Sequence, residues 1–292
     1  MRVLSLFDGI SCGMVALERA NIKVDEYIAY EIDKNAIKIS KDNYPKIEQK
    51  GSVINANFKQ YEGFDLLIGG SPCQDLSITR SQTRESLNGI KSKLFYEYVR
   101  AFNETKPKYF LFENVASMNN ESKEIISQLL GVQPVFINSN CFVAQDRPRL
   151  YWTNIPCYTS NLKECNLCLN DILEKTVDEK YFYNYPLLNI DLSKQVCATM
   201  DFKNNEMHKR IFNPNFKVHT LTTCGGGNTQ KKVYVDGKAR KLTPLEYERL
   251  QGLPDNYTRC VANTNRYTAI GNGWTVDVIA HIFKGLIEEQ QC

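Results

Sequence analysis

The stretch Phe64-Asp-Leu-Leu-Ile-Gly-Gly70 is an almost continuous apolar run that ends at two glycines. A short run without polar alternation is typical of a strand that is buried on both faces of a parallel sheet. Residues 108–112 have the same character. We therefore expect these two stretches to be central strands of one sheet.

Strand and helix patterns alternate over the first 155 residues around these two runs. The other predicted strands are 3–7, 26–32, 135–138 and 150–153, and the predicted helices are 13–20, 34–43, 94–102 and 122–130. Strands separated by helical patterns indicate βαβ units in an α/β fold, a Rossmann-like sheet with helices on both faces. Ligands of such sheets bind beyond the carboxyl ends of the strands.

The regular alternation stops after residue 156. Residues 157–239 carry scattered aromatic side chains and a glycine run, so we expect a smaller, irregular region there. A helix at 242–250, with Thr243 as its N-cap, and a last helix at 275–289 indicate a return to regular structure. The predicted division of the chain is 1–156, 157–239 and 240–292.

Composition excludes several classes of protein. With 42% hydrophobic and 24% charged residues, the 292-residue chain is an ordinary globular sequence and not a disordered chain, a collagen or a coiled coil. No apolar run approaches the length of a membrane-spanning helix. The first apolar run is broken by Asp8, unlike a signal peptide, so we expect a cytoplasmic protein with free thiols.

The charge of the chain is unevenly distributed. Residues 201–241 hold nine Lys and Arg against three Asp and Glu, which gives this stretch a net charge of +6. Because the whole chain is +3, the remainder is 3 − 6 = −3. A local basic stretch suits a polyanion such as nucleic acid. The alternative is a basic face that is simply solvated.

Two features near the N-terminus indicate a site for a nucleoside-bearing cofactor. A glycine turn, Phe7-Asp-Gly-Ile-Ser-Cys-Gly13, follows the first strand and opens a helix whose free N–H groups can face a ligand. Glu31 follows at the end of the second strand, where a carboxylate can bind ribose hydroxyls. The alternative is an ordinary turn glycine and a surface glutamate.

Polar residues with catalytic potential follow the buried strands. Cys73 lies in a Pro-Cys-Gln sequence, and its thiolate would be a strong nucleophile. Glu113 comes directly after a buried strand, where a carboxyl group can act as an acid or base. Arg147 and Arg149 project to the same side of an extended segment and can bind a carbonyl oxygen or phosphate.

Seven motifs in a fixed order resemble the DNA (cytosine-5)-methyltransferase family, and they span nearly the whole chain. They are Phe7-Asp-Gly-Ile-Ser-Cys-Gly13, Glu31, Pro72-Cys73-Gln74, Glu113-Asn-Val115, Gln145-Asp-Arg-Pro-Arg149, Arg249-Leu-Gln-Gly252 and Gly271-Asn-Gly-Trp274. The Phe-Asp-Gly-Ile opening and the final Trp are similar to the eukaryotic de novo branch. The chain length is more similar to a bacterial or phage enzyme.

The resemblance implies a reaction and a set of residues for it. Cys73 would attack carbon 6 of a cytosine flipped out of duplex DNA, Glu113 would contact ring nitrogen 3, and Arg147 and Arg149 would hold the base or a phosphate. Carbon 5 would receive the methyl group of S-adenosylmethionine. The implied cofactor residues are Phe7, Asp8, Gly9, Ser11, Gly13, Glu31, Ile32, Pro72, Leu94, Asn272 and Trp274.

The resemblance also implies how DNA is recognised. Residues 75–93 would close over the flipped base, and residues 157–239 would form a target-recognition region. The expected DNA-binding residues are Gln74, Ser77, Arg80, Arg84, Gln145, Thr222, Thr223, Asn228, Lys231 and Lys232. Two positions depart from the family pattern: Gly51-Ser52 lacks the usual acid after its glycine, and Trp274 replaces the usual aliphatic residue.

The expected partner is double-stranded DNA, with a companion restriction enzyme as an option, no membrane and no obligate protein partner. The expected location is the cytoplasm of a bacterial or phage-infected cell, at the nucleoid. No metal is expected, because Cys165 and Cys168 form a single Cys-x-x-Cys pair. A catalytically weak DNA-binding regulator and an RNA cytosine-5 methyltransferase are the alternative functions.

Overall fold

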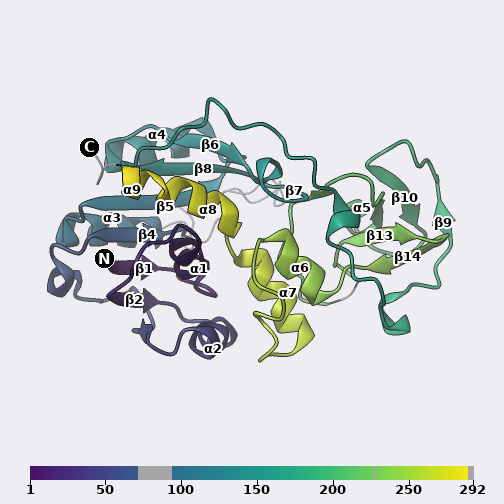
Figure 1. Cartoon of the computed structure of the whole chain (residues 1–292), viewed down its shortest axis with the longest axis horizontal. Coiled ribbons are helices and arrows are strands. Elements are labelled where there is room, and N and C mark those ends of the chain that lie inside the picture. Colours follow the sequence, from purple (N-terminus) through teal and green to yellow (C-terminus); the bar gives the residue numbers. More distant parts are fainter. Residues whose placement is uncertain (72–93, 227, 289–292) are drawn as a thin grey trace. The chain divides into compact units, whose positions relative to one another are not determined.

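The computed structural model describes residues 1–71, 94–226 and 228–288 (Figure 1). The chain forms two compact units. The first consists of Met1–Ile137, Pro148–Asn161 and Val278–Cys292, and the second of Asn138–Arg147 and Leu162–Asp277. This division differs from the predicted one, because residues 138–147 and 240–277 belong to the second unit and residues 157–161 belong to the first.

The first unit is built on a seven-stranded sheet in the order β3-β2-β1-β4-β5-β8-β6. Its strands are β1 (Arg2–Leu6), β2 (Glu26–Tyr30), β3 (Glu48–Gln49), β4 (Leu66–Gly69), β5 (Tyr109–Val115), β6 (Val135–Asn138) and β8 (Pro148–Thr153). The pairs among β1 to β5 are parallel, and β8 runs antiparallel to β5. The predicted α/β fold is therefore confirmed.

Helices connect these strands as predicted. They are α1 (Cys12–Arg19), α2 (Lys34–Asn43), α3 (Leu94–Thr105), α4 (Asn120–Leu130), α8 (Val276–Phe283) and α9 (Gly285–Glu288), and η1 (Phe58–Tyr61) is a 3-10 turn. Asp33 caps α2 by accepting hydrogen bonds from the backbone of Asn35 and Ala36. The predicted last helix is interrupted at Lys284, and β3 was not predicted.

The core of the first unit lies where the apolar runs indicate. Every residue of β4 is buried, and Phe112 of β5 packs against Phe95, Tyr98 and Trp152. Gly69, at the end of β4, has no room for a side chain, because an added Cβ would lie 2.9 Å from the backbone oxygen of Leu6. The close packing of β4 fixes the position from which the chain leaves the sheet toward Cys73.

The second unit contains a five-stranded sheet in the order β14-β13-β11-β10-β9, where an irregular region was expected. Its strands are β9 (Leu187–Leu188), β10 (Val196–Met200), β11 (Arg210–Phe212), β13 (Lys232–Val235) and β14 (Lys238–Lys241), and β7 (Gln145–Asp146) pairs separately with β12 (Val218–His219). A small apolar core within this unit includes Cys197, Met200 and Ile211.

Helices of the second unit carry two of its motifs. They are α5 (Glu206–Lys209), α6 (Pro244–Leu250) and α7 (Asn263–Asn272), with 3-10 turns η3 (Ser139–Cys141), η4 (Leu169–Asp171) and η5 (Glu179–Tyr181). Thr243 caps α6 as predicted, and Glu246 completes a capping box. The buried Glu246 carboxylate also accepts two hydrogen bonds, of 2.8 and 2.6 Å, from Arg240, which compensates its desolvation.

Candidate active site and cofactor site

The turn between β1 and α1 is held in an unusual backbone conformation. Phe7, Gly9 and Ser11 have φ values of 57°, 60° and 60°, in the left-handed region that side chains other than glycine rarely adopt. An added Cβ on Gly9 would meet no atom within 4 Å. The backbone of the turn at Gly9 is therefore not covered by a side chain. It lies next to the first N–H groups of α1, beyond the end of the sheet.

The side chain of Asp8 stabilises this turn from within. Its carboxylate accepts hydrogen bonds from the hydroxyls of Ser5 (2.6 Å), Ser11 (2.5 Å) and Tyr27 (2.7 Å). Burial raises the pKa of the Asp8 carboxyl despite these bonds. Ser11 is itself buried and also contacts Ser40, which argues against the predicted contact of its side chain with the cofactor.

Glu31 lies just beyond the end of β2, beside the glycine turn. One carboxylate oxygen accepts a hydrogen bond of 2.8 Å from Gly9 N, and the other accepts bonds from the backbone of Ile32 and Asp33. A carboxylate has about four acceptor positions, so this fixed group keeps capacity for a hydroxyl. Ile32 is 73% exposed, which leaves an apolar surface next to the carboxylate.

These features fit a nucleoside-bearing cofactor such as S-adenosylmethionine. The open space at Gly9 admits a ligand, Glu31 can accept from a sugar hydroxyl, and Ile32 offers an apolar contact for a base. Gly13 is buried in α1, and Leu94 is the half-buried first residue of α3. Ser52, at the position of the missing acid, accepts a hydrogen bond from Ile54 N.

Glu113 and Arg149 form an ion pair in the first unit. Arg149 Nε donates to a Glu113 carboxylate oxygen at 2.8 Å, and the side chains are only 12% and 13% exposed. The pair crosses two antiparallel strands, because Glu113 lies opposite Tyr151 and Arg149 lies opposite Val115. Strand β5 extends through Glu113 to Val115, so Glu113 lies within the strand and not after it as predicted. A charged hydrogen-bond donor thus orients the carboxyl group.

Polar atoms without partners lie next to this pair at the strand ends. Among the described residues, the hydroxyl of Ser71 and the amide nitrogen of Asn114 are buried and make no hydrogen bond. The pairing of β4 with β5 ends with Gly69 opposite Phe112, and Ser71 and Asn114 each follow two residues later in the chain. Buried polar groups usually have partners, so these two mark a region that can receive a polar ligand. Pro72 and Cys73, which follow directly, lie outside the described residues.

Arg147 and Gln145 have structural contacts in the second unit. The Arg147 guanidinium is 6% exposed and donates to the backbone oxygens of Leu221 (2.8 Å), Gly271 (3.2 Å) and Gly273 (3.0 Å). The fully buried side chain of Gln145 bonds to Leu221 N and Leu250 O. These contacts argue against the predicted roles of Arg147 at the base and of Gln145 at DNA, because both polar groups are already bonded to the protein.

The family model for C-5 cytosine-specific DNA methylases matches residues 1–288. The chain belongs to this family. It is 27% identical to the type II methyltransferase M1.ScrFI of Lactococcus lactis subsp. cremoris, over 98% of this chain and 78% of that protein. It is 33% identical to the orphan methyltransferase M.Rho11sI of Bacillus phage rho11s, over 82% of this chain and 53% of that protein. The Entamoeba histolytica methyltransferase EhMeth has a similar fold, with a TM-score of 0.77 at 18% identity over 99% of this chain and 98% of that one.

The remaining site residues of this C-5 cytosine methylase lie in the second unit or outside the described residues. Asn272 ends α7 and Trp274 follows it, both in the second unit. Gly271 is required for packing, since an added Cβ would lie 2.4 Å from Thr222 O. Outside the described residues are Pro72, Cys73, Gln74, Ser77, Arg80 and Arg84.

The expected DNA-binding residues of the methylase differ in exposure. Thr223 is exposed, whereas Thr222 and Asn228 are half-buried. Lys232 is fully buried, and its ammonium donates to the backbone oxygens of His208 (2.6 Å), Asn228 (2.7 Å) and Gln230 (2.9 Å). These contacts argue against the predicted contact of Lys232 with phosphate, because its ammonium is withdrawn from solvent and bonded within the protein.

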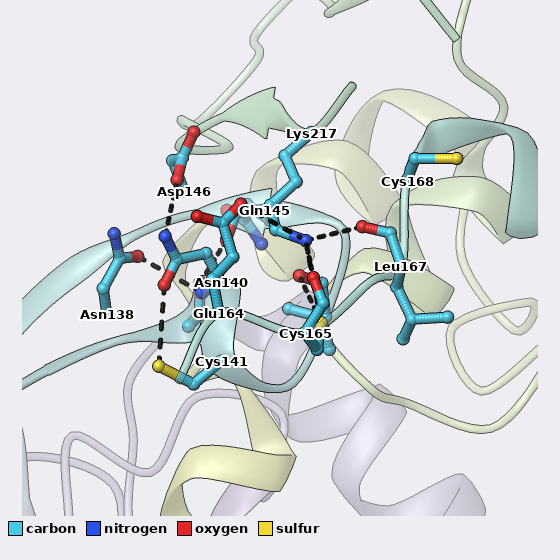
Figure 2. Close-up of polar contacts among 12 residues, drawn as sticks. Asn138, Asn140, Cys141, Gln145, Asp146, Glu164, Cys165, Leu167, Cys168 and Lys217 are labelled. Atoms are coloured by element: carbon cyan, nitrogen blue, oxygen red, sulfur yellow. Dashed lines mark hydrogen bonds and ion pairs between the residues drawn. The ribbon is translucent and has the colours of Figure 1, made fainter. Parts of the chain in front are cut away.

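A second buried lysine joins distant segments of the same unit. Figure 2 shows Lys217 donating to the backbone oxygens of Cys165 and Leu167, each at 2.6 Å. Asp146 lies nearby and accepts a hydrogen bond from Asn140.

Within the described ranges, no group of three His, Cys, Asp or Glu side chains could hold a metal ion. No described helix has the length and apolar character needed to cross a membrane.

Sequence reasoning missed the residue that organises the second unit's motifs. The side chain of Gln251 is fully buried and donates to Ile270 O and Gly273 O, while its oxygen accepts from Gln145 and Thr275. Gln251 belongs to the Arg249-Leu-Gln-Gly252 motif, so the signal was present in the sequence. Its function as a hydrogen-bonding centre becomes visible only in the fold.

Proposed function

We propose that the chain transfers a methyl group from S-adenosylmethionine to carbon 5 of a flipped-out cytosine in duplex DNA, at a short recognition sequence. The observation that carries this proposal is the Glu113–Arg149 pair of 2.8 Å at the end of β5, in a chain of the C-5 cytosine-specific DNA methylase family. The pair supplies an oriented carboxyl group beside the strand end that leads to Cys73.

The chemistry proceeds through a covalent adduct with Cys73. The thiolate adds to carbon 6 of the cytosine, and the electron pair of the 5,6 double bond becomes available at carbon 5. Glu113 contacts ring nitrogen 3 and the exocyclic amine and delivers a proton as the ring gains electron density, while Arg149 orients Glu113. S-adenosylmethionine supplies the methyl group when bound. A base then removes the proton from carbon 5, and the bond to Cys73 breaks.

The cofactor proposal predicts a specific loss of binding. Glu31→Ala is expected to weaken S-adenosylmethionine binding by about 1–3 kcal/mol, the cost of losing hydrogen bonds to a charged group. Calorimetry measures this affinity directly. Glu26→Ala, at the exposed start of β2, is the matched control and should bind the cofactor normally. An unchanged affinity in Glu31→Ala would mean that Glu31 is not the ribose ligand.

We propose that the segment around the second unit's glycine run selects the DNA sequence that is methylated. Thr222, Thr223 and Asn228 flank Gly225 and Gly226, and Asn228 adopts a φ of 62° that turns the chain sharply. Substitution of Thr223, which is exposed, is expected to change which sequence is methylated while the rate of the chemical step at a preferred site remains. Methylome sequencing of the variants decides this. If the variants lose activity equally at all target sequences and keep the same site preference, target recognition belongs to another part of the chain.

The proposed function is tested by tritium transfer from S-adenosylmethionine to duplex DNA and, in parallel, to transfer RNA. Transfer to DNA alone supports the proposal, and transfer to RNA alone would favour an RNA methyltransferase. Tight DNA binding without transfer would favour a regulator. Sequencing 5-methylcytosine in a host that expresses the chain then gives the target.

A cytoplasmic location at the nucleoid follows from a DNA substrate. A companion restriction enzyme remains a proposal, because the similar proteins include both a type II and an orphan methyltransferase.

A further inference from the structure

Two cationic side chains and the imidazole of His219 gather on one face of the second unit's sheet. Strands β11 and β13 pair in parallel with Ile211 opposite Lys232, which brings Arg210 beside Lys231. The Lys231 ammonium lies 5.7 Å from the centre of the Phe212 ring, and the edge of that ring meets His219 at 4.9 Å. We call Arg210, Lys231 and His219 the cationic cluster.

The two cations of the cluster have no acidic partner in the part of the chain that the structure describes. Neither Arg210 nor Lys231 forms an ion pair there, and neither side chain donates a hydrogen bond. Lys231 is only 9% exposed, so its charge is largely withdrawn from water. An unpaired ammonium in such a position is costly, and a negatively charged ligand would offset that cost.

The neighbouring groups show how uncompensated this charge is. Burial and Arg210 lower the pKa of Lys231 to about 8, although the Cys224 thiol opposes the shift. Burial, Lys231 and Arg210 also lower the pKa of His219, against the opposing effect of Asp146. Burial is the largest cause of both shifts, and the neighbouring cations contribute in the same direction.

Hydrogen bonds orient His219 within the cluster. Its Nε2 lies 3.1 Å from the side-chain oxygen of Gln195, whose own amide donates to Asp146 and to Lys217 O. Because the Gln195 amide nitrogen is the donor in those bonds, its oxygen accepts and His219 Nε2 carries a proton. The carboxylate of Asp146 accepts from the amides of Gln195 and Asn140 and partly offsets the effect of the two cations on His219, but it forms no ion pair with Arg210 or Lys231.

We propose that Arg210, Lys231 and His219 form a seat for a single backbone phosphate of the DNA substrate. A phosphate diester carries one negative charge and accepts several hydrogen bonds, which matches an unpaired guanidinium and an unpaired ammonium. The Nε2 proton of His219 is donated to Gln195, so the imidazole borders the seat and donates to the phosphate only when Nδ1 is also protonated. Arg210 and His219 are half-buried and reach the surface, whereas the Phe212 ring forms the floor. The inference deepens the proposed function, since it rests on DNA being the substrate.

Two adjacent lysines therefore have opposite functions. Lys232 is bonded to three backbone oxygens and stabilises the second unit, while Lys231 retains an unpaired charge for the ligand. Methionine has nearly the shape of lysine without its charge. Lys231→Met should therefore fold at least as stably as the wild type, because it removes a desolvated charge.

The experiment measures binding of the full chain to a mixed-sequence duplex over about 50 to 200 mM KCl. Lys231→Met and Arg210→Gln are each expected to lower the slope of log K against log salt by about 0.9 and to weaken binding about five-fold near 0.15 M. Because both residues bind the same phosphate, the double variant should lose about 0.9 and not twice that. If neither variant changes the slope of log K against log salt, the proposal is overturned. It is also overturned if the double variant loses the sum of the two single losses, because the residues would then bind different phosphates.

Two further readouts separate the seat from a merely structural role. A bound phosphate raises the pKa of Lys231, so wild-type affinity should fall as pH rises above about 8, and Lys231→Met should lose that part of the pH dependence. Lys232→Met is the matched control. It should lower the thermal stability of the protein but leave the affinity of each folded molecule for the duplex unchanged. Equal pH profiles in wild type and Lys231→Met would contradict the proposal.

The outcome is distinguishable from failure of the proposed function. If the wild type methylates DNA and both variants bind DNA like the wild type, the proposed function holds and the proposed phosphate seat is wrong. A wild-type chain that neither binds nor methylates duplex DNA would overturn the function itself.

Discussion

Cys73→Ser is expected to reduce methyl transfer by a factor on the order of 10³ or more, with little effect on the fold or on cofactor binding. Serine is far less nucleophilic than a thiolate near neutral pH, so the addition to carbon 6 fails. The rate is measured in a single turnover with tritiated S-adenosylmethionine. With 5-fluorocytosine at the target, the wild type should form an adduct that survives denaturation, and Cys73→Ser should not.

Cys157→Ser is the matched control for the nucleophile. Burial raises the pKa of the Cys157 thiol to about 11, so this thiol is protonated at neutral pH and is a poor nucleophile. The variant should form the adduct at the wild-type rate. Retention of even a few per cent of the single-turnover rate in Cys73→Ser would contradict the assignment of Cys73, whatever the control shows.

Glu113→Gln has the second largest expected effect, a loss of about 10²–10⁴-fold in the rate of methyl transfer. Glutamine fills the same space and can still accept a hydrogen bond from Arg149, but it cannot deliver a proton to ring nitrogen 3. Single-turnover kinetics at saturating cofactor measures the loss, and calorimetry should show an unchanged affinity for S-adenosylmethionine. A rate within a few-fold of the wild type would exclude Glu113 as the proton donor.

Glu121→Gln provides the control for that substitution. Glu121 lies in the first turn of α4, and the same chemical change there should leave the transfer rate unaltered. Arg149→Met adds a test of orientation. Loss of the 2.8 Å ion pair should lower the rate less than Glu113→Gln does, because the carboxyl group remains but is less well positioned.

The sheet of the first unit was predictable because of how parallel strands are buried. Strand β4 is covered on both faces, so its sequence is a continuous apolar run. The two glycines at the end of this run mark the end of the strand. The bounds of α2 and β6 match the prediction residue for residue, because a capping residue or a turn marks each. β3 was missed, since two residues carry no periodicity.

The sheet of the second unit could not be read in the same way. Its strands are short, and β11 pairs in parallel with β13 across an intervening stretch that contains β12. Such pairing is set by distant contacts and leaves no local pattern. Helix α7 was missed as well, because it begins with polar residues and has no side-chain cap.

Site residues were predictable in type but not in burial. The motifs identified Glu113 and Arg149, which the structure brings together, and Glu31, which lies at the glycine turn. Lys231 and Lys232 are identical in sequence terms, yet one is bonded to three backbone oxygens and the other is unpaired. Strand register decides which face each side chain takes, and register follows from tertiary packing.

The interleaving of the two units constrains how the chain can be made on the ribosome. The first unit includes Val278, Ile279, Ile282 and Phe283, all of which are fully buried. These residues are translated only after the whole second unit, so the earlier sheet waits on the order of ten seconds for its last helix. During that interval, while the second unit is being translated, the nascent sheet lacks the apolar side chains that α8 contributes to the core of the first unit. The nascent chain therefore meets the cell's chaperones with its catalytic half unfinished.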